Sequence, residues 1–168
     1  MKRFTCLLLV IFLVISISAC GSHDNGNSAV FYYPRSSYSY SGSDSVITSE
    51  SRTTDGYLAI SNLLQYYMQG PEDINLINPF PQNITVHSVL SEGTVLSIVL
   101  SDHMADLADV QLILACVCLA KTAIGITNAS SVRISCDTEL LAGKNYIEIN
   151  DNMVFLEDLY PASTQGSK

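Results

Sequence analysis

Apolar residues recur at helical spacing over residues 55–71. The positions that would share one helix face are Tyr57, Ile60, Leu64, Tyr67 and Met68. Asp55 suits the N-cap position, and Gly70 followed by Pro71 is a typical stop signal. The spacing therefore predicts an amphipathic helix over 55–71.

A second helix is predicted to begin at Ser101 or Asp102 and to end near Ile124, before Gly125. Its segment 112–120 is apolar on every side. A helix of that kind is either buried or membrane-spanning, and this segment is shorter than the roughly 20 residues that a span requires. We therefore expect it to be the central buried helix of the domain.

The remaining apolar positions alternate or cluster in short runs, which is typical of strands. Strands are predicted over 29–34 and 46–53, and residues 84–90 and 94–100 are expected to form a hairpin around Gly93. Further strands are predicted over 131–137, 145–149 and 153–157, the last two joined by the turn residues 150–152. The order β-β-α-β-β-α-β predicts one α+β domain, with two helices on one face of a mostly antiparallel sheet.

The N-terminal residues are typical of an export signal. Lys2 and Arg3 precede an apolar stretch, Phe4 to Ile17, and small residues follow it. Ile17-Ser18-Ala19-Cys20 resembles the lipobox of bacterial lipoproteins, in which the cysteine receives a diacylglyceryl group and cleavage occurs just before it. Two or more acyl chains anchor a protein stably to a membrane.

These segments predict the domain organisation. Residues 1–19 are interpreted as a lipoprotein signal peptide, and residues 20–28 as the lipidated Cys20 with a polar tether. The folded domain is expected over 29–160, and 161–168 is a polar tail. The mature chain is therefore expected on the extracytoplasmic face of the cell membrane; an uncleaved anchor helix is the alternative.

The charge balance narrows the classes of partner. Without Lys2 and Arg3, six basic residues face sixteen acidic ones, a formal charge of −10. Nucleic-acid binding depends on neutralising phosphates, so nucleic acid is not expected as a partner. The acidity is expected to favour solubility.

Residue types that could act in catalysis or bind a metal are present, but they do not form a recognised catalytic or metal-binding motif. Asp102, His103 and Asp106 could be interpreted as a metal cluster, but helix capping and dipole compensation explain the same residues without a metal and are the preferred interpretation. No nucleophile elbow and no phosphate-binding glycine loop is found, so no catalytic residue, metal or cofactor is predicted, and a small-molecule ligand is not expected. His87 is expected on the exposed face of its strand. The tyrosines at 32, 33, 38 and 40 could stack on sugar rings or pack at the edge of a core.

Three cysteines remain in the mature chain besides Cys20. Cys116, Cys118 and Cys136 lack zinc-ligand spacing and are expected to be buried small hydrophobic residues. A disulfide from Cys136 to one of the other two is the alternative in an exported protein.

The stretch from Tyr57 onward resembles the GerM (GerMN) domain of spore-forming bacteria. The matching residues are Leu63-Leu64 before Gly70-Pro71, then Pro79-Phe80-Pro81, Gly93-Thr94-Val95-Leu96-Ser97, Leu100-Ser101 and Val132. Val99 stands where the family has an aspartate, so any role of that carboxylate is absent here. The resemblance covers roughly residues 29–136.

The resemblance implies a lipoprotein that acts at the cell envelope in sporulation or spore germination. It also implies a fold like the ring-building motifs of sporulation assemblies, and it transfers no catalytic residue. Two hypotheses follow. The first is a non-enzymatic lipoprotein that contacts envelope proteins or assembles with itself. The second is an extracytoplasmic protein that binds or hydrolyses cell-wall glycan or peptide.

Overall fold

Strands and helices follow one another in nearly the expected order. The computed structural model describes residues 27–36, 45–54, 56 and 59–152. Their elements are β1 (Ser28–Pro34), β2 (Ile47–Thr53), α2 (Ile60–Tyr67), β3 (Val86–Glu92), β4 (Val95–Leu100), the 3₁₀ helix η1 (Asp102–Asp106), α3 (Asp109–Thr127), β5 (Ser131–Cys136) and β6 (Ile147–Asn150). The predicted strand 153–157, the tail 161–168, the predicted signal peptide 1–19 and Cys20 lie outside the described residues.

The strands form two sheets, whereas the sequence suggested one. β1 and β2 pair as an antiparallel hairpin, and the larger sheet has the order β3-β4-β5-β6. Only the β4–β5 pairing within the described sheets is parallel. The α+β class and the mostly antiparallel pairing are confirmed.

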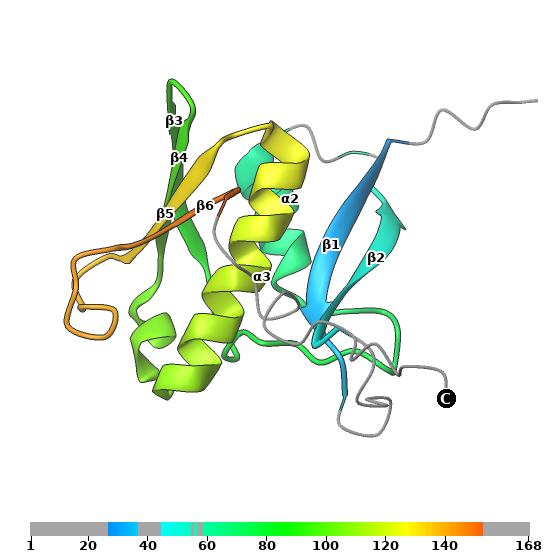
Figure 1. The fold of residues 1–168 in the computed structure, drawn as a ribbon, viewed down its shortest axis with the longest axis horizontal. Helices are drawn as coiled ribbons and strands as arrows, with labels where there is room; N and C mark the ends of the chain where they lie inside the picture. The colour runs from blue at the N-terminus through cyan, green and yellow to red at the C-terminus, as the bar shows by residue number, and fades with distance from the viewer. Residues whose placement is uncertain (1–26, 37–44, 55, 57–58, 153–168) are drawn as a thin grey trace, which may run out of the picture.

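Helix α3 explains the separation into two sheets. It packs against β1 on one side and against β5 and β6 on the other. Figure 1 shows α3 running between the β1–β2 hairpin and the larger sheet. Both strand layers bury apolar side chains against the same central helix. The β1–β2 hairpin therefore need not pair with the edge of the larger sheet to bury its apolar face.

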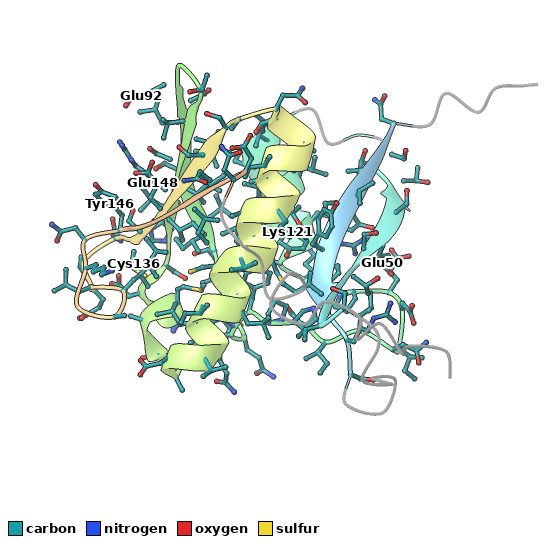
Figure 2. The ribbon with its side chains drawn as sticks, in the orientation of Figure 1. Glu50, Glu92, Lys121, Cys136, Tyr146 and Glu148 are labelled. Carbon is teal, nitrogen blue, oxygen red and sulfur yellow. The ribbon has the colours of Figure 1, made fainter. Side chains whose placement is uncertain are left out.

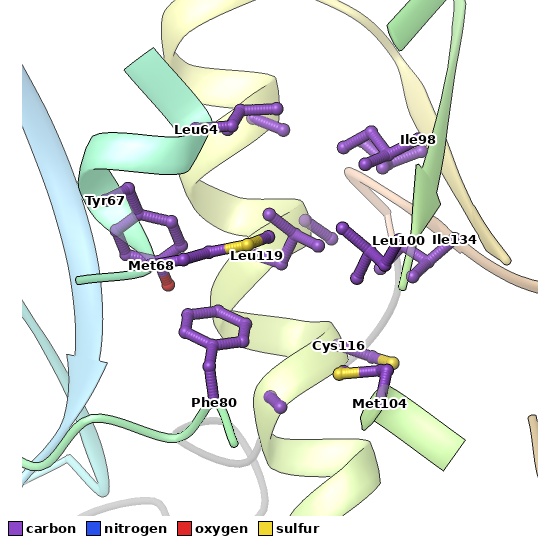
Figure 3. Packing of buried hydrophobic residues seen from close by; sticks show 14 of the residues in the cluster. Leu64, Tyr67, Met68, Phe80, Ile98, Leu100, Met104, Cys116, Leu119 and Ile134 are labelled. Carbon is purple, nitrogen blue, oxygen red and sulfur yellow. The ribbon is translucent and has the colours of Figure 1, made fainter. Parts of the chain in front are cut away.

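The core is one continuous cluster around α3. Leu119 and Ala115 are fully buried on the helix, and Leu64 from α2 packs into the same cluster. Leu96, Ile98 and Leu100 alternate inward along β4, which matches the two-residue period of a strand. Figure 3 shows Leu119 between Met68 and Leu100, a side chain of the larger sheet. The prediction of a central buried helix is confirmed.

The start of α3 was predicted incorrectly. Ser101 and Asp102 begin η1, and the backbone is then extended at Leu107 and Ala108 before α3 starts at Asp109. The Ser101 hydroxyl accepts the amide hydrogen of Thr85, the residue before β3, at 3.1 Å, so this bond uses the group that was expected to cap the helix.

The predicted end of α3 is also wrong. The helix continues through Gly125 to Thr127 and ends at Asn128, whose φ of 57° is left-handed. Asparagine tolerates this conformation better than most residues because its short side chain can bond locally. With 19 residues and a mean hydropathy of 1.9, α3 is long and apolar enough to cross a membrane by these two measures. Core helices meet the same criteria, and packing on both sides identifies α3 as one.

Helix α2 is shorter than expected. It begins after Ala59, which makes no side-chain capping bond, and it ends at Tyr67. Asp55, the predicted N-cap, lies outside the described residues. Gly70 has a φ of 105°, a conformation that favours glycine, and a Cβ there would lie 3.1 Å from the Asn78 side chain, which is a tight contact. The hairpin predicted around Gly93 is confirmed as β3–β4.

Candidate functional site

A groove of about 750 Å³ lies between α3 and β6. Ile113, Cys116 and Val117 line it from the helix, and Ile147 and Ile149 line it from the strand. The volume falls within the range of roughly 300–1,000 Å³ that is usual for binding pockets. The groove is therefore the first candidate for a binding site.

The groove lies beside β6, the last strand of the larger sheet in the described part of the chain. Ile149 is buried and Ile147 is half-buried, whereas Glu148 and Asn150 point outward. On α3, Ile113 remains 54% exposed and Val110 remains 76% exposed. An apolar stripe of the helix thus continues past the edge of the sheet.

Polar side chains line the rim of this groove. Arg133 Nε donates to Glu148 Oε2 at 2.8 Å, and the Tyr146 ring centroid lies 5.3 Å from the guanidinium. The hydrogen bond from Arg133 lowers the pKa of Glu148 below its ordinary value. Figure 2 shows Glu148 and Tyr146 at this edge of the molecule. Lys144 and Asn145 continue the rim.

The outer face of the larger sheet forms a second candidate surface. Leu90 on β3 is 56% exposed, and Val95 and Val99 on β4 are only half-buried. The register places these residues on the face opposite the helices, because Leu96 and Ile98 occupy the alternate positions. Strand β3 is the other outer strand of this sheet in the part of the chain described here.

The predicted acidic and histidine cluster is divided in space. Asp102 accepts hydrogen bonds from Thr138 and from the amide of Glu139, and these bonds lower its pKa. His103 and Asp106 form a separate exposed pair with an Nδ1–Oδ2 distance of 3.7 Å. Among the residues described, no group of three His, Cys, Asp or Glu side chains could hold a metal ion. His87 is exposed, as predicted, and its Nδ1 lies 3.8 Å from Asp137 Oδ2.

The three cysteines are free and buried, which confirms the prediction for their side chains and leaves the alternative disulfide unformed. Burial raises the pKa of Cys116 to about 12 and that of Cys136 to about 11. Cys136 Sγ donates to the carbonyl oxygen of Ser101 at 3.7 Å. These thiols are consequently protonated at neutral pH and are poor nucleophiles.

The described tyrosines of the 32–40 segment are used for packing. Tyr33 is fully buried and donates its hydroxyl hydrogen to the Tyr67 carbonyl oxygen at 2.7 Å. Tyr32 is half-buried, and Lys121 Nζ lies 5.1 Å from its ring centroid. Lys121 extends from α3 toward β1 in Figure 2. Tyr38 and Tyr40 lie outside the described residues.

Sequence reasoning missed Arg52. This residue is only 6% exposed, with its guanidinium 4.4 Å from the Phe31 ring centroid and 4.5 Å from that of Tyr66. Arginine is usually exposed, so its burial was not expected. The one signal in the sequence was its position in the first third of the chain, which is rich in aromatic residues. Because Arg52 is buried against Phe31 and Tyr66, we assign this group of side chains to the stability of the domain and not to a binding site.

Comparison with known proteins leaves the family open. No family model matches the chain, and no relative is found among curated proteins. Among solved structures, the chain is similar to a "Putative Lipoprotein from Clostridium perfringens" with 15% identity and a TM-score of 0.47, over 74% of this chain and 87% of that one. A TM-score below 0.5 is too low to support an argument about family or function.

Proposed function

We propose that this protein is a non-enzymatic lipoprotein of the cell envelope that acts through protein–protein contacts. The N-terminal charge, the apolar stretch and the small residues before Cys20 support export and lipid anchoring. In this proposal Cys20 holds the chain at the extracytoplasmic face of the membrane, and the domain over 29–160 meets its partners there.

The observation that carries the proposal is the exposed outer face of the larger sheet. Leu90 projects there beside the half-buried Val95 and Val99, and β3 is an outer strand of the described sheet. Outer strands present backbone donors and acceptors that can pair with another chain. Anchoring in a membrane raises the effective concentration of the domain for partners in the same membrane, so weak contacts suffice.

The finer proposal is a GerM-type role in sporulation or spore germination. It rests on the matching residues, which occupy packing and turn positions: Leu64 is in the core, Gly70 and Gly93 adopt positive φ, and Leu96 is buried. Those roles suit a shared fold. They do not specify a partner, which can be another envelope protein or a second copy of the chain.

Two experiments test the proposal. Cys20→Ser should abolish incorporation of a labelled lipid precursor and release the protein from the membrane fraction; equal labelling of variant and wild type would exclude the lipobox. A photo-crosslinking residue at position 90 should capture a discrete envelope protein or the chain itself in intact cells. The control is the same residue at position 74, where Ile74 is 92% exposed in a loop. Equal capture at both positions would refute the assignment of the surface.

Glycan or peptide binding is the second candidate. Its support is the groove rim, where Tyr146 is 48% exposed next to Asn145. Aromatic rings and amides are suited to contact sugar rings and hydroxyl groups. Binding of purified peptidoglycan fragments at micromolar affinity, abolished by Tyr146→Ala, together with no crosslinked partner at position 90, would favour this candidate over the first.

A further inference from the structure

The open edge of β3 is short and can be read from the hairpin register. Glu92 stands beside the two-residue turn, and a residue in that position is hydrogen-bonded to the partner strand. Because this bonding alternates, Leu90 and Ser88 also direct their backbone groups to β4. Val89 and Ser91 direct their amide and carbonyl groups away from β4.

Gln65 of α2 occupies the beginning of this edge. Its Oε1 accepts the Val86 amide hydrogen at 2.8 Å, and its Nε2 donates to the Ile84 carbonyl oxygen at 3.0 Å. Among the residues that the structure describes, no hydrogen bond involves the outward backbone groups of Val89 and Ser91. Each residue contributes one donor and one acceptor, so the open edge is confined to these two residues.

The two open residues lie symmetrically about Leu90. We propose that β3 pairs with β3 of a second copy, antiparallel and across a two-fold axis, with Leu90 opposite Leu90 of that copy. This inference rests on the proposed function, because it names the partner of the same outer strand and relies on the membrane anchor to bring copies together. Ser91 then stands opposite Val89 of the second copy, and the reverse pair forms by symmetry. All open backbone groups of both copies are satisfied at once.

The exposed leucine supports this register. Leu90 is 56% exposed on the outer face of the sheet. Side chains directly opposite each other in an antiparallel pair are in contact, so the two leucines would remove each other's apolar surface from water. The pairing thus joins backbone bonds with burial of the most exposed apolar side chain of β3.

Charge also favours a second copy as the occupant. The chain has a formal charge of −8, but the ionisable residues of β3 are only His87 and Glu92. The register places Glu92 of one copy opposite Ser88 of the other and next to His87 along that strand, and a hydroxyl and an imidazole can both donate to a carboxylate. The two Glu92 residues stand about 14 Å apart along the strands, beyond the Debye length of about 8 Å at physiological ionic strength. Two acidic chains therefore meet without opposing like charges.

The first test is oxidative cross-linking of the full, membrane-anchored chain in intact cells. Opposite residues in such a pair have Cα atoms about 4.5–5.5 Å apart, which is within disulfide range. Leu90→Cys should therefore give disulfide-linked dimers when copper phenanthroline is added. Ser97→Cys is the matched control, because Ser97 pairs with Leu90 on the same face of one chain. In the proposed dimer its two copies lie about 14 Å apart, three strand spacings, and should not link.

Mixed pairs of cysteines test the register. Chains with Ser88→Cys and chains with Glu92→Cys should link to each other when they are produced together, because residue 88 stands opposite residue 92 of the second copy. Ser88→Cys produced alone should not link. Wild type is the blank, since Cys116, Cys118 and Cys136 are buried.

The second test removes a backbone donor. Ser91→Pro, added to the Leu90→Cys chain, deletes an amide hydrogen that β4 does not use, and edge strands tolerate proline at such positions. Half of the bonds between the copies are lost, so the initial rate of disulfide formation should fall about tenfold. Ser51→Pro in β2 is the control and should leave the rate unchanged. Ser51 is exposed and pairs with Val30, and its amide faces away from β1, since the equivalent Tyr32 amide donates outside the hairpin to α3.

The outcomes separate this inference from the proposed function. Absence of dimers from Leu90→Cys, equal linking of Ser97→Cys, or an unchanged rate with Ser91→Pro would each overturn the pairing of two copies. If the photo-crosslinking residue at position 90 then captures another envelope protein, the proposed function stands with a different partner. If position 90 captures nothing beyond the position 74 control, both the pairing and the proposed surface are refuted.

Discussion

Arg52 holds its guanidinium 4.4 Å from the centroid of the Phe31 ring, inside the core. Its Nη2 donates to the Tyr33 hydroxyl at 2.7 Å and its Nη1 donates to the Gly70 carbonyl oxygen at 3.1 Å. Glu50 supplies the countercharge, with an Nε–Oε2 distance of 3.4 Å. A buried cation is tolerated here because aromatic faces, hydrogen bonds and a carboxylate replace its water. This residue ties the β1–β2 hairpin to the end of α2.

Removing this cation should destabilise the domain strongly. Arg52→Ala removes the cation beside Glu50 and opens a space beside Phe31, so we expect the free energy of unfolding to fall by about 3 kcal/mol. Urea denaturation measures this free energy of unfolding. Arg133→Ala is the control, because its ion pair with Glu148 is exposed and should matter little. Equal effects of the two substitutions would contradict the role assigned to Arg52.

Helix α3 should not tolerate a charge on its buried face. Leu119 is fully buried, and Leu119→Asp places an uncompensated carboxylate in the core at a cost of several kcal/mol, comparable to the stability of a small domain. We expect the thermal transition monitored by circular dichroism to lose its cooperativity. Gln111→Asp, on the exposed side of the first turn of α3, should melt near the wild-type temperature. A normal transition for Leu119→Asp would refute the central placement of α3.

Asp102 should contribute to stability in a pH-dependent way. Its bonds to Thr138 and Glu139 hold its pKa below the ordinary value of 3.8. A carboxylate with a lowered folded-state pKa stabilises the fold above the unfolded-state pKa, and this contribution disappears as the pH falls through the folded-state pKa. Asp102→Asn should therefore lower the melting temperature at pH 7. Near pH 2 the melting temperatures of variant and wild type should lie closer together. A constant difference across that range would argue against the assignment.

The three buried thiols should react slowly with alkylating reagents. The pKa values of Cys116 and Cys136, about 12 and about 11, leave almost no thiolate at pH 8. We expect mass spectrometry to show little labelling of Cys116, Cys118 and Cys136 by iodoacetamide in the native protein and complete labelling in denaturant without reductant. Failure to label them in denaturant until a reductant is added would show that a disulfide forms.

Local features could be predicted from sequence because they depend on neighbouring residues. The hairpin around Gly93 was recognisable since a turn with positive φ favours glycine. The buried character of α3 followed from an apolar run with no polar face. The helix boundaries were wrong because the groups that decide them come from elsewhere: Ser101 bonds to Thr85, and Asp102 bonds to Thr138.

The candidate surfaces could not be predicted from the sequence. Neither the groove between α3 and β6 nor the burial of Arg52 has a local pattern, since each depends on elements brought together by folding. The sequence by itself determined the α+β class, and it predicts an export signal with lipidation at Cys20. Only the tertiary structure decided that the strands divide into two sheets around α3, because burial on both sides of a helix is a property of packing and not of periodicity.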